Sequence, residues 1–393
     1  MPRAERLAFI CPRFAEGSVT GGAETLIKAL ALRAGQAGRE VVFLTTCATN
    51  HFTWKNEAPP GERIIDGLRV RFFPVDDDRD IESFLRIQAV ISRKGSVSQT
   101  DEQTWIANSV NSRALCQHLK DEGRRFDRIV IGPYLFGLTH TAAGVHPHKT
   151  LLVPCLHDEG FAYLNLFRDL FNQVSGCMFN SEPERDLARR LYALPRERCA
   201  VVGMGLNPFE ADPNAFSRRH QMQAPYVIYS GRREVGKGTP LLMDYLALFR
   251  ERTGRDVKLV LTGSGEIRPP PELAPHIMDL GFVPEPDKHE AMAGAIAFCH
   301  PSTLESFSIV LLESWLAQTP ALVHAQCDVT RFHCQASGGG LWFRVYPEFE
   351  EALMGLMDHA SLRKAMGLAG HRYALREYSW DAIDAKLFAT LDL

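Results

Sequence analysis

The chain has almost no net charge, no long apolar run and no paired cysteine motif, and each absence excludes a class of protein. Its 44 basic and 47 acidic residues leave a formal charge of −3, which gives no footprint for nucleic acid. No stretch approaches the roughly 18 apolar residues that cross a membrane. The 9 cysteines include no C-x-x-C pair, so neither a disulfide framework nor a zinc site is indicated.

The start of the chain indicates a cytoplasmic protein. Only six residues precede the apolar run 7–11, which is too few for a signal peptide. The aromatic and leucine side chains of 161–171 are amphipathic enough to predict a peripheral contact with the inner face of the membrane. A buried helix is the more common explanation of the same pattern.

Short apolar runs alternate with helical periodicity along the chain, as in α/β folds whose parallel strands are buried on both faces. The alternation occurs twice, which predicts two doubly wound, Rossmann-like domains. Strands are expected at 7–11, 41–45, 68–73, 128–132, 150–155, 176–179 and 200–203, and again at 226–230, 257–262, 277–281, 295–299, 321–324 and 340–344.

Glycines and prolines between 203 and 213 mark a linker between the two domains. We therefore expect an N-terminal domain over 1–205, a C-terminal domain over 206–377 and a last segment over 378–393. The polar, unpatterned stretch 92–104 predicts a mobile surface loop.

Glu305 and Glu313 form the most informative pair in the sequence. Glu305 follows the apolar strand 295–299, and Glu313 is expected about two turns into the next helix. Between them, Ser306-Phe307-Ser308 supplies backbone N–H groups at a helix start, where phosphate binds readily. Two carboxylates and an anion-binding backbone suit a nucleotide sugar, although two solvated glutamates beside a capped helix would give the same pattern.

In each half of the chain, one glycine-rich loop follows the first strand. Gly21-Gly22 allows a backbone to approach a phosphate closely, or forms a flexible turn. Arg232 and Lys237 are cations in the second loop and indicate an anionic ligand, unless the loop is an exposed basic turn. Neither loop has the G-x-G-x-x-G or Walker A spacing, so neither is a dinucleotide fingerprint or a P-loop.

His157 follows a predicted parallel strand, at the edge where open α/β sheets bind ligands. It is suited to contact a substrate hydroxyl or a developing charge, or else pairs with a neighbouring carboxylate. The run Asp76-Asp77-Asp78 suggests a metal site, but no partner ligands accompany it. A solvated acidic turn is the favoured interpretation, and no metal is expected.

Eight segments in order resemble retaining glycosyltransferase family 4, whose GT-B fold has two facing Rossmann-like domains. Each segment is weak alone, but together they cover nearly the whole chain. They are Gly21-Gly22-Ala-Glu24, His157-Asp158, Asn180-Ser181-Glu182, Gly231-Arg232 through Lys237-Gly238, Leu261 through Gly265, Leu280 through Val283, Pro301-Ser302 with Glu305 through Glu313, and Tyr378 through Asp381. In the family, the segment 378–393 is a helix that crosses back to the first domain.

The resemblance implies a role for each candidate residue. The catalytic candidates are His157, near the reacting carbon, and Glu305, on the donor-sugar hydroxyls. The donor-binding candidates are Gly21, Gly22, Arg232 and Lys237 for the diphosphate, Phe282 and Val283 for the base, Ser306, Phe307 and Ser308 for sugar and phosphate, and Glu313 for the ribose.

The implied reaction moves a hexose from a nucleoside-diphosphate sugar to a saccharide or glycolipid, with retention of anomeric configuration and without metal or cofactor. The nucleotide sugar is a co-substrate. A nucleotide-sugar epimerase and a non-catalytic nucleotide-sugar-binding subunit remain alternatives. Two departures bear on donor pose: Ser306-Phe307-Ser308 replaces the common Gly-Phe-Gly, and Gln318 replaces a glycine before Thr-Pro.

Overall fold

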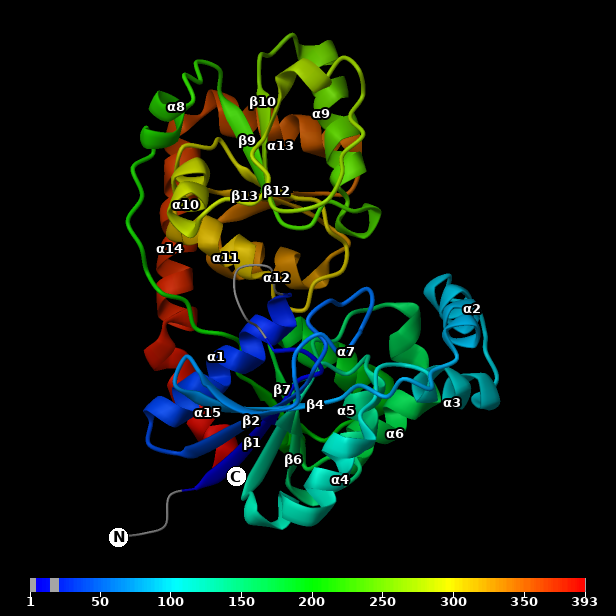
Figure 1. The fold of residues 1–393 in the computed structure, drawn as a ribbon. Coiled ribbons are helices and arrows are strands. Elements are labelled where there is room, and N and C mark those ends of the chain that lie inside the picture. Colours follow the sequence, from blue (N-terminus) through cyan, green and yellow to red (C-terminus); the bar gives the residue numbers. More distant parts are fainter. Residues whose placement is uncertain (1–4, 15–20, 393) are drawn as a thin grey trace. The chain divides into compact units, whose positions relative to one another are not determined.

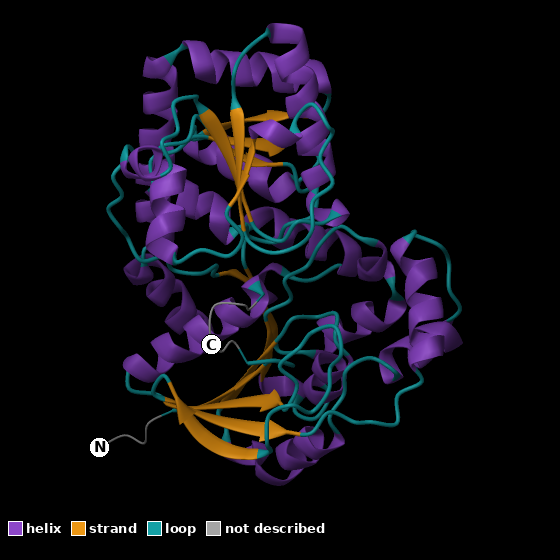
Figure 2. Ribbon diagram, turned by 45° about the horizontal axis from the view of Figure 1, so that its top comes forward, coloured by secondary structure: helices purple, strands orange, loops and turns teal. Residues whose placement is uncertain are grey.

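The structure is a computed structural model that describes residues 5–14 and 21–392, and the chain divides into two compact units. Unit 1 comprises residues 1–204 and 383–393, and unit 2 comprises residues 205–382. Each unit has a largely parallel β-sheet flanked by helices (Figures 1 and 2). Two doubly wound α/β domains are therefore present, as the alternating pattern predicts.

Unit 1 contains an eight-stranded sheet in the order β3-β4-β2-β1-β5-β6-β7-β8. Its strands are β1 (Arg6–Ile10), β2 (Glu40–Thr46), β3 (Gly61–Ile65), β4 (Leu68–Phe73), β5 (Arg128–Ile131), β6 (Thr150–Leu152), β7 (Gly176–Phe179) and β8 (Cys199–Val201). Its helices are α1 (Gly22–Gln36), α2 (Ile81–Ser92), α3 (Gln99–Ala107), α4 (Arg113–Glu122), α5 (Gly137–Ala143), α6 (Asn165–Gln173) and α7 (Glu182–Tyr192). The last helix, α15 (Trp380–Leu391), belongs to unit 1 from Ile383 onward.

Unit 2 contains a six-stranded parallel sheet in the order β11-β10-β9-β12-β13-β14. Its strands are β9 (Tyr226–Ser230), β10 (Lys258–Thr262), β11 (Ile277–Asp279), β12 (Phe298–His300), β13 (Ala321–His324) and β14 (Gly340–Phe343). Its helices are α8 (Ala215–Arg219), α9 (Thr239–Thr253), α10 (Glu285–Ala293), α11 (Ile309–Leu316), α12 (Asp328–Ser337), α13 (Tyr346–Asp358) and α14 (Ala360–Tyr378).

The strand order of unit 2 places a topological switch point between β9 and β12. From β9 the chain proceeds outward through β10 and β11, then returns to β12 on the other side of β9. In open α/β sheets the ligand crevice lies where this reversal occurs, beyond the carboxyl ends of the strands. The loops that follow Ser230 and His300 therefore meet at the expected ligand-binding edge.

The edge strand β3 was not predicted. Its residues are mostly exposed and include Glu62 and Arg63, so it lacks the apolar run that identifies a buried strand. It pairs antiparallel with β4, whereas the other neighbouring strands in the sheet pair in parallel. Charged side chains on an edge strand discourage pairing with a further chain.

The predicted loop over 92–104 is present only at 93–98, between α2 and α3; from Gln99 onward the prediction is wrong, because α3 begins there. Ser98 accepts a hydrogen bond from the backbone N–H of Asp101, and the Asp101 carboxylate accepts from the Ser98 N–H. This capping box is readable in the sequence as Ser-x-x-Asp. The helix buries few apolar side chains, chiefly Trp105 and Ile106, so it has little apolar periodicity to reveal it.

The amphipathic segment 161–171 belongs to the core of unit 1. Leu166, Phe167, Leu170 and Phe171 on α6 are buried in the main apolar cluster. The buried-helix explanation therefore accounts for this pattern. Separately, no helix formed by the described residues combines the length and apolar character needed to cross a bilayer.

Glu184 on α7 is a buried carboxylate that joins the loops after β6 and β7, at the carboxyl end of the unit 1 sheet. Its Oε1 accepts the Leu156 N–H at 2.6 Å, and its Oε2 accepts the Asn180 N–H at 2.5 Å. Leu156 directly precedes His157. Burial raises the pKa of Glu184 to about 8, although the backbone N–H groups act in the opposite direction.

The raised pKa of Glu184 predicts a stability that decreases with pH. The folded state binds this proton more tightly than the unfolded state, so the contribution is complete below pH 4.5 and is lost as the pH rises towards 8. From pH 5 to pH 8, the free energy of unfolding measured with urea should fall further for the wild type than for Glu184→Gln. The difference between the two falls should exceed about 1 kcal/mol. The exposed Glu182→Gln is the matched control. Parallel pH profiles for wild type and Glu184→Gln would contradict the assignment.

Candidate functional site

Lys237 and Glu305 meet at the switch point of unit 2. Lys237 lies in the loop after β9, and Glu305 lies in the loop after the neighbouring strand β12. The Lys237 Nζ is 2.7 Å from the Glu305 Oε1, and both side chains are mostly buried. The sheet thus brings together two candidate residues that are 68 positions apart in the sequence.

The carboxylate of Glu305 is held on one side only. Its Oε1 contacts both Lys237 and the Nε2 of His300, the latter at 3.1 Å. Among the described residues, both side-chain hydrogen bonds of Glu305 are to Oε1 and none is to Oε2. Burial acts to raise the pKa of Glu305, but Lys237 and His300 outweigh it and hold the pKa well below its ordinary value. Glu305 is therefore ionised and has one oxygen available for a ligand.

Ser308 is the N-cap of α11 and adopts the left-handed conformation, with φ 67°. Gln318, the other departure from the glycines of the family, also has a positive φ of 59°. Both positions thus have the backbone geometry that glycine adopts most readily. The Ser308 Oγ lies 3.3 Å from the His300 Nε2, so the serine contacts the side chain that also holds Glu305.

Glu313 lies closer to the helix start than predicted. Because α11 begins at Ile309, Glu313 is little more than one turn into the helix rather than about two. Its Oε2 accepts from the Lys288 Nζ at 2.9 Å. Burial raises the pKa of Glu313, although the ammonium of Lys288 lowers it. Each of the two predicted glutamates therefore has its own lysine.

Glu313, Glu285 and His289 place one potential metal-ligating atom each within 4.8 Å of one another. However, the Lys288 Nζ is 2.7 Å from Glu285 and 2.9 Å from Glu313. The hydrogen bond from His289, together with Lys288, lowers the pKa of Glu285 to about 2. The Lys288 ammonium thus already supplies a positive charge between the two carboxylates, which fits an ion-pair cluster better than a metal centre.

The remaining donor-binding candidates of unit 2 differ in exposure. The Arg232 side chain is 54% exposed, and its distance of 3.9 Å from Glu234 is too long for a hydrogen bond. Its guanidinium can therefore bind an anion. Phe282 is 53% exposed and Val283 is partly buried. The ring of Phe307 is buried against Tyr378, which leaves its backbone as the part suited to a ligand. Ser306 is partly buried.

The candidates in unit 1 lie at the start of α1 and in the loop after β6. Gly21 caps α1 and Gly22 is its first residue. A Cβ on Gly21 would come within 2.4 Å of the Glu24 carboxylate, which also accepts from Arg13. A side chain at position 21 would therefore require the Glu24 carboxylate to shift.

The Nδ1 of His157 lies 3.6 Å from the Glu159 carboxylate, as in the local-pairing alternative. The buried Tyr134 donates to the same Glu159 oxygen at 3.2 Å. At 3.6 Å the histidine lies beside the carboxylate without a hydrogen bond between them.

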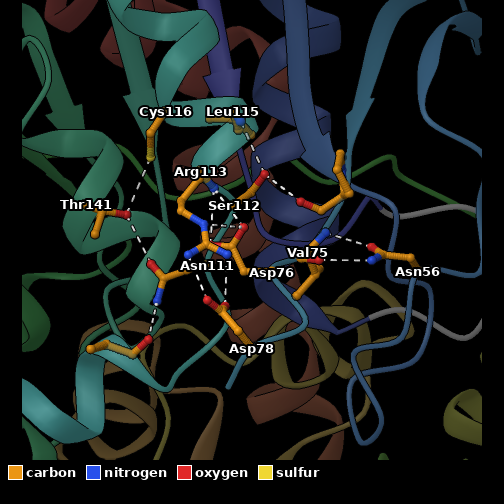
Figure 3. Close-up of polar contacts among 12 residues, drawn as sticks. Asn56, Val75, Asp76, Asp78, Asn111, Ser112, Arg113, Leu115, Cys116 and Thr141 are labelled. Atoms are coloured by element: carbon orange, nitrogen blue, oxygen red, sulfur yellow. Dashed lines mark hydrogen bonds and ion pairs between the residues drawn. The ribbon is translucent and has the colours of Figure 1, made fainter. Parts of the chain in front are cut away.

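The acidic run Asp76-Asp77-Asp78 is partly neutralised by arginine (Figure 3). Arg113 binds both oxygens of Asp78, at 2.8 and 2.9 Å, and its backbone N–H donates to Asp76. The preceding Val75 is fixed to Asn56 by two hydrogen bonds. The run is thus an ordered acidic turn tied to the start of α4.

Sequence reasoning did not identify His300 or Lys288. His300 is the last residue of β12, directly before Pro301-Ser302, and its position at a strand end could have drawn attention to it. Lys288 has no comparable signal, because its proximity to Glu313 depends on how α10 packs on α11.

Comparisons with known proteins support the resemblance. Residues 211–372 match the family described as glycosyl transferases group 1. The phosphatidyl-myo-inositol mannosyltransferase of Mycobacterium tuberculosis is 30% identical over 241 residues, which cover 57% of this chain and 62% of that protein. The α-D-kanosaminyltransferase of Streptomyces kanamyceticus is 24% identical over 278 residues, which cover 66% of this chain and 70% of that protein.

Solved structures extend the likeness of fold to nearly the whole chain. Sucrose-phosphate synthase from Thermosynechococcus elongatus has a TM-score of 0.70 at 13% identity and covers 98% of both chains. The Anabaena HepE protein, solved in complex with UDP-glucose, has a TM-score of 0.69 at 14% identity, with coverage of 98% and 99%. The chain has the GT-B fold, and its residues 211–372 match the family model of the group 1 glycosyltransferases.

Removing the ammonium of Lys237 should destabilise the protein. Lys237→Met leaves Glu305 ionised and largely buried without its main partner. We expect the free energy of unfolding to fall by about 1–3 kcal/mol, less than for a fully buried pair because the two side chains keep 23% and 12% exposure. Urea denaturation measures the change, with the exposed Lys364→Met as control. Adding Glu305→Met should recover part of the loss, and strictly additive losses would argue against the pair.

Proposed function

We propose that the protein is a retaining glycosyltransferase that moves a hexose from a nucleoside-diphosphate sugar to a saccharide or glycolipid acceptor. The observation that carries the proposal is the switch-point site of unit 2. There the ionised Glu305 presents one oxygen, next to the cationic loop after β9 and the start of α11. The named activities of the relatives support the same class of reaction.

The two glutamates of the site bind different parts of the donor. Glu305 is held by Lys237 and His300 at the helix start and accepts hydroxyl groups of the sugar through Oε2. Glu313, one turn further along α11, accepts the ribose hydroxyls. The backbone N–H groups of Phe307 and Ser308 bind sugar and phosphate oxygens.

Arg232 neutralises the charge that develops on the departing diphosphate. In the reaction, the bond between the anomeric carbon and the diphosphate oxygen breaks, and a bond from the acceptor oxygen to that carbon forms. The acceptor hydroxyl loses its proton to the leaving group. The main requirements are positioning and leaving-group stabilisation, which fixed cations and backbone dipoles can meet without a metal. Lys237 contributes charge to the same region while holding Glu305.

The candidates of unit 1 complete the proposal. We assign His157, which lies beside Glu159, to the donor sugar near the reacting carbon, and Gly21 and Gly22 to the diphosphate. The mannosyltransferase relative is named for a phosphatidyl-inositol, so a lipid-linked acceptor at the inner face of the membrane belongs among those to be tested.

The test is a product assay. Purified protein is incubated with UDP-, GDP-, ADP- and dTDP-sugars and a panel of saccharide and glycolipid acceptors, and products are identified by mass spectrometry and NMR. A new glycosidic bond with the donor's anomeric configuration supports the proposal. An epimerised donor without transfer, or binding without any turnover, would replace it with the epimerase or the non-catalytic subunit.

Glu305→Gln and Glu313→Gln should have different effects. Glu305→Gln should reduce transfer at least tenfold while leaving the affinity for free nucleoside diphosphate nearly unchanged, because Glu305 contacts only the sugar. Glu313→Gln should weaken both, and its penalty should shrink with a deoxyribose donor. Calorimetry and initial rates measure the two effects. Equal losses of nucleotide affinity in both variants would disprove the division.

Transfer should persist in EDTA. Arg232, Lys237 and the N–H groups at the start of α11 provide positive charge for the leaving group, and Lys288 lies between the carboxylates of Glu285 and Glu313. Initial rates with and without EDTA should agree within about twofold. Loss of turnover that Mg²⁺ or Mn²⁺ restores would reverse this expectation.

A further inference from the structure

His300 is a buried titratable residue that contacts two residues of the candidate site, Glu305 and Ser308. It is the last residue of β12, and its side chain is only 4% exposed. The ring lies nearly parallel to those of Phe298 and Tyr229, with centroids 5.5 and 6.5 Å away. It is therefore packed in place and has little freedom to rotate.

The two ring nitrogens of His300 have different surroundings. Nε2 lies 3.1 Å from the Glu305 Oε1 and 3.3 Å from the Ser308 Oγ. Nδ1 is buried and has no hydrogen-bond partner among the described residues. A proton on Nδ1 would be a buried donor without an acceptor, whereas a proton on Nε2 faces a carboxylate. The surroundings therefore favour the neutral ring with its proton on Nε2.

This tautomer accounts for the asymmetry of Glu305. Lys237 and His300 both donate to Oε1, Lys237 from the loop after β9 and His300 from the end of the neighbouring strand β12. With Oε1 held from two directions, the carboxylate cannot rotate without losing a hydrogen bond. Oε2 is then the oxygen left for a ligand hydroxyl.

We infer that His300 is a positioning residue that, as a neutral imidazole protonated on Nε2, holds Glu305 Oε1 and thereby presents Oε2 to the donor sugar. The inference rests on the proposed function of the site and adds a residue to it. Ser308 takes part because its hydroxyl shares Nε2, which a glycine at the same left-handed position could not do.

The tautomer can be measured directly. Two-bond ¹H–¹⁵N correlation spectra of ¹⁵N-histidine-labelled protein at pH 7 distinguish a neutral Nε2–H ring from the Nδ1–H tautomer and from imidazolium. The His300 signals among the 14 histidines are assigned by their loss in His300→Gln. A neutral Nε2–H ring is expected, and either other form would overturn the inference.

Kinetics test the effect on Glu305. His300→Phe removes the donor but keeps an aromatic ring, so kcat/KM for the donor should fall about tenfold or more, while the Kd for free nucleoside diphosphate changes less than threefold. His300→Gln, whose amide can donate to the carboxylate, should retain more activity than His300→Phe. The control is His371→Gln, a partly buried histidine on α14 that contacts the Leu316 carbonyl.

Two kinetic results would refute the inference: His300→Phe turning over as fast as His371→Gln, or nucleotide affinity and turnover falling equally. If wild type transfers no sugar from any donor, the proposed function fails. The tautomer spectrum still decides the inference in that case, because it requires no turnover.

Discussion

The ion pair between Lys237 and Glu305 is the interaction on which the candidate site depends. The strand order of unit 2 places the loops after β9 and β12 side by side, and this pair joins them. Burial alone would favour a neutral carboxyl at Glu305, but the ammonium and the His300 ring keep it ionised. Without the pair, the site would lose its fixed carboxylate and the ion pair that joins its two loops.

The same arrangement recurs at Glu313, where Lys288 holds one carboxylate oxygen. Each glutamate is thus mostly buried, which favours discrimination between ligands, and each is held in one position by a lysine. Removing one partner of a buried ion pair is costly, whereas replacing the whole pair by apolar residues is often neutral. These pairs therefore restrict the geometry more than they stabilise the fold. This restriction suits a donor whose hydroxyl groups must be recognised individually.

The fold could be predicted from the sequence more completely than the site. Buried parallel strands such as β9 and β13 have continuous apolar runs, whereas the exposed edge strand β3 has none. Glu305, Arg232 and Lys237 were recognisable as polar residues in loops after strands, and Glu313 was recognisable by its place in the helix that follows. The pairing of Lys237 with Glu305, and the contacts of His300 and Lys288, depend on packing between distant segments, which no local pattern encodes.

The central claim is that unit 2 binds a nucleoside-diphosphate sugar at its switch point. A crystal structure of the protein with a bound nucleotide sugar tests it most directly. The account predicts the sugar on Glu305 Oε2, the ribose on Glu313 and the diphosphate against Arg232 and the start of α11. A nucleotide bound elsewhere, or a sugar that leaves both glutamates without contact, would contradict it.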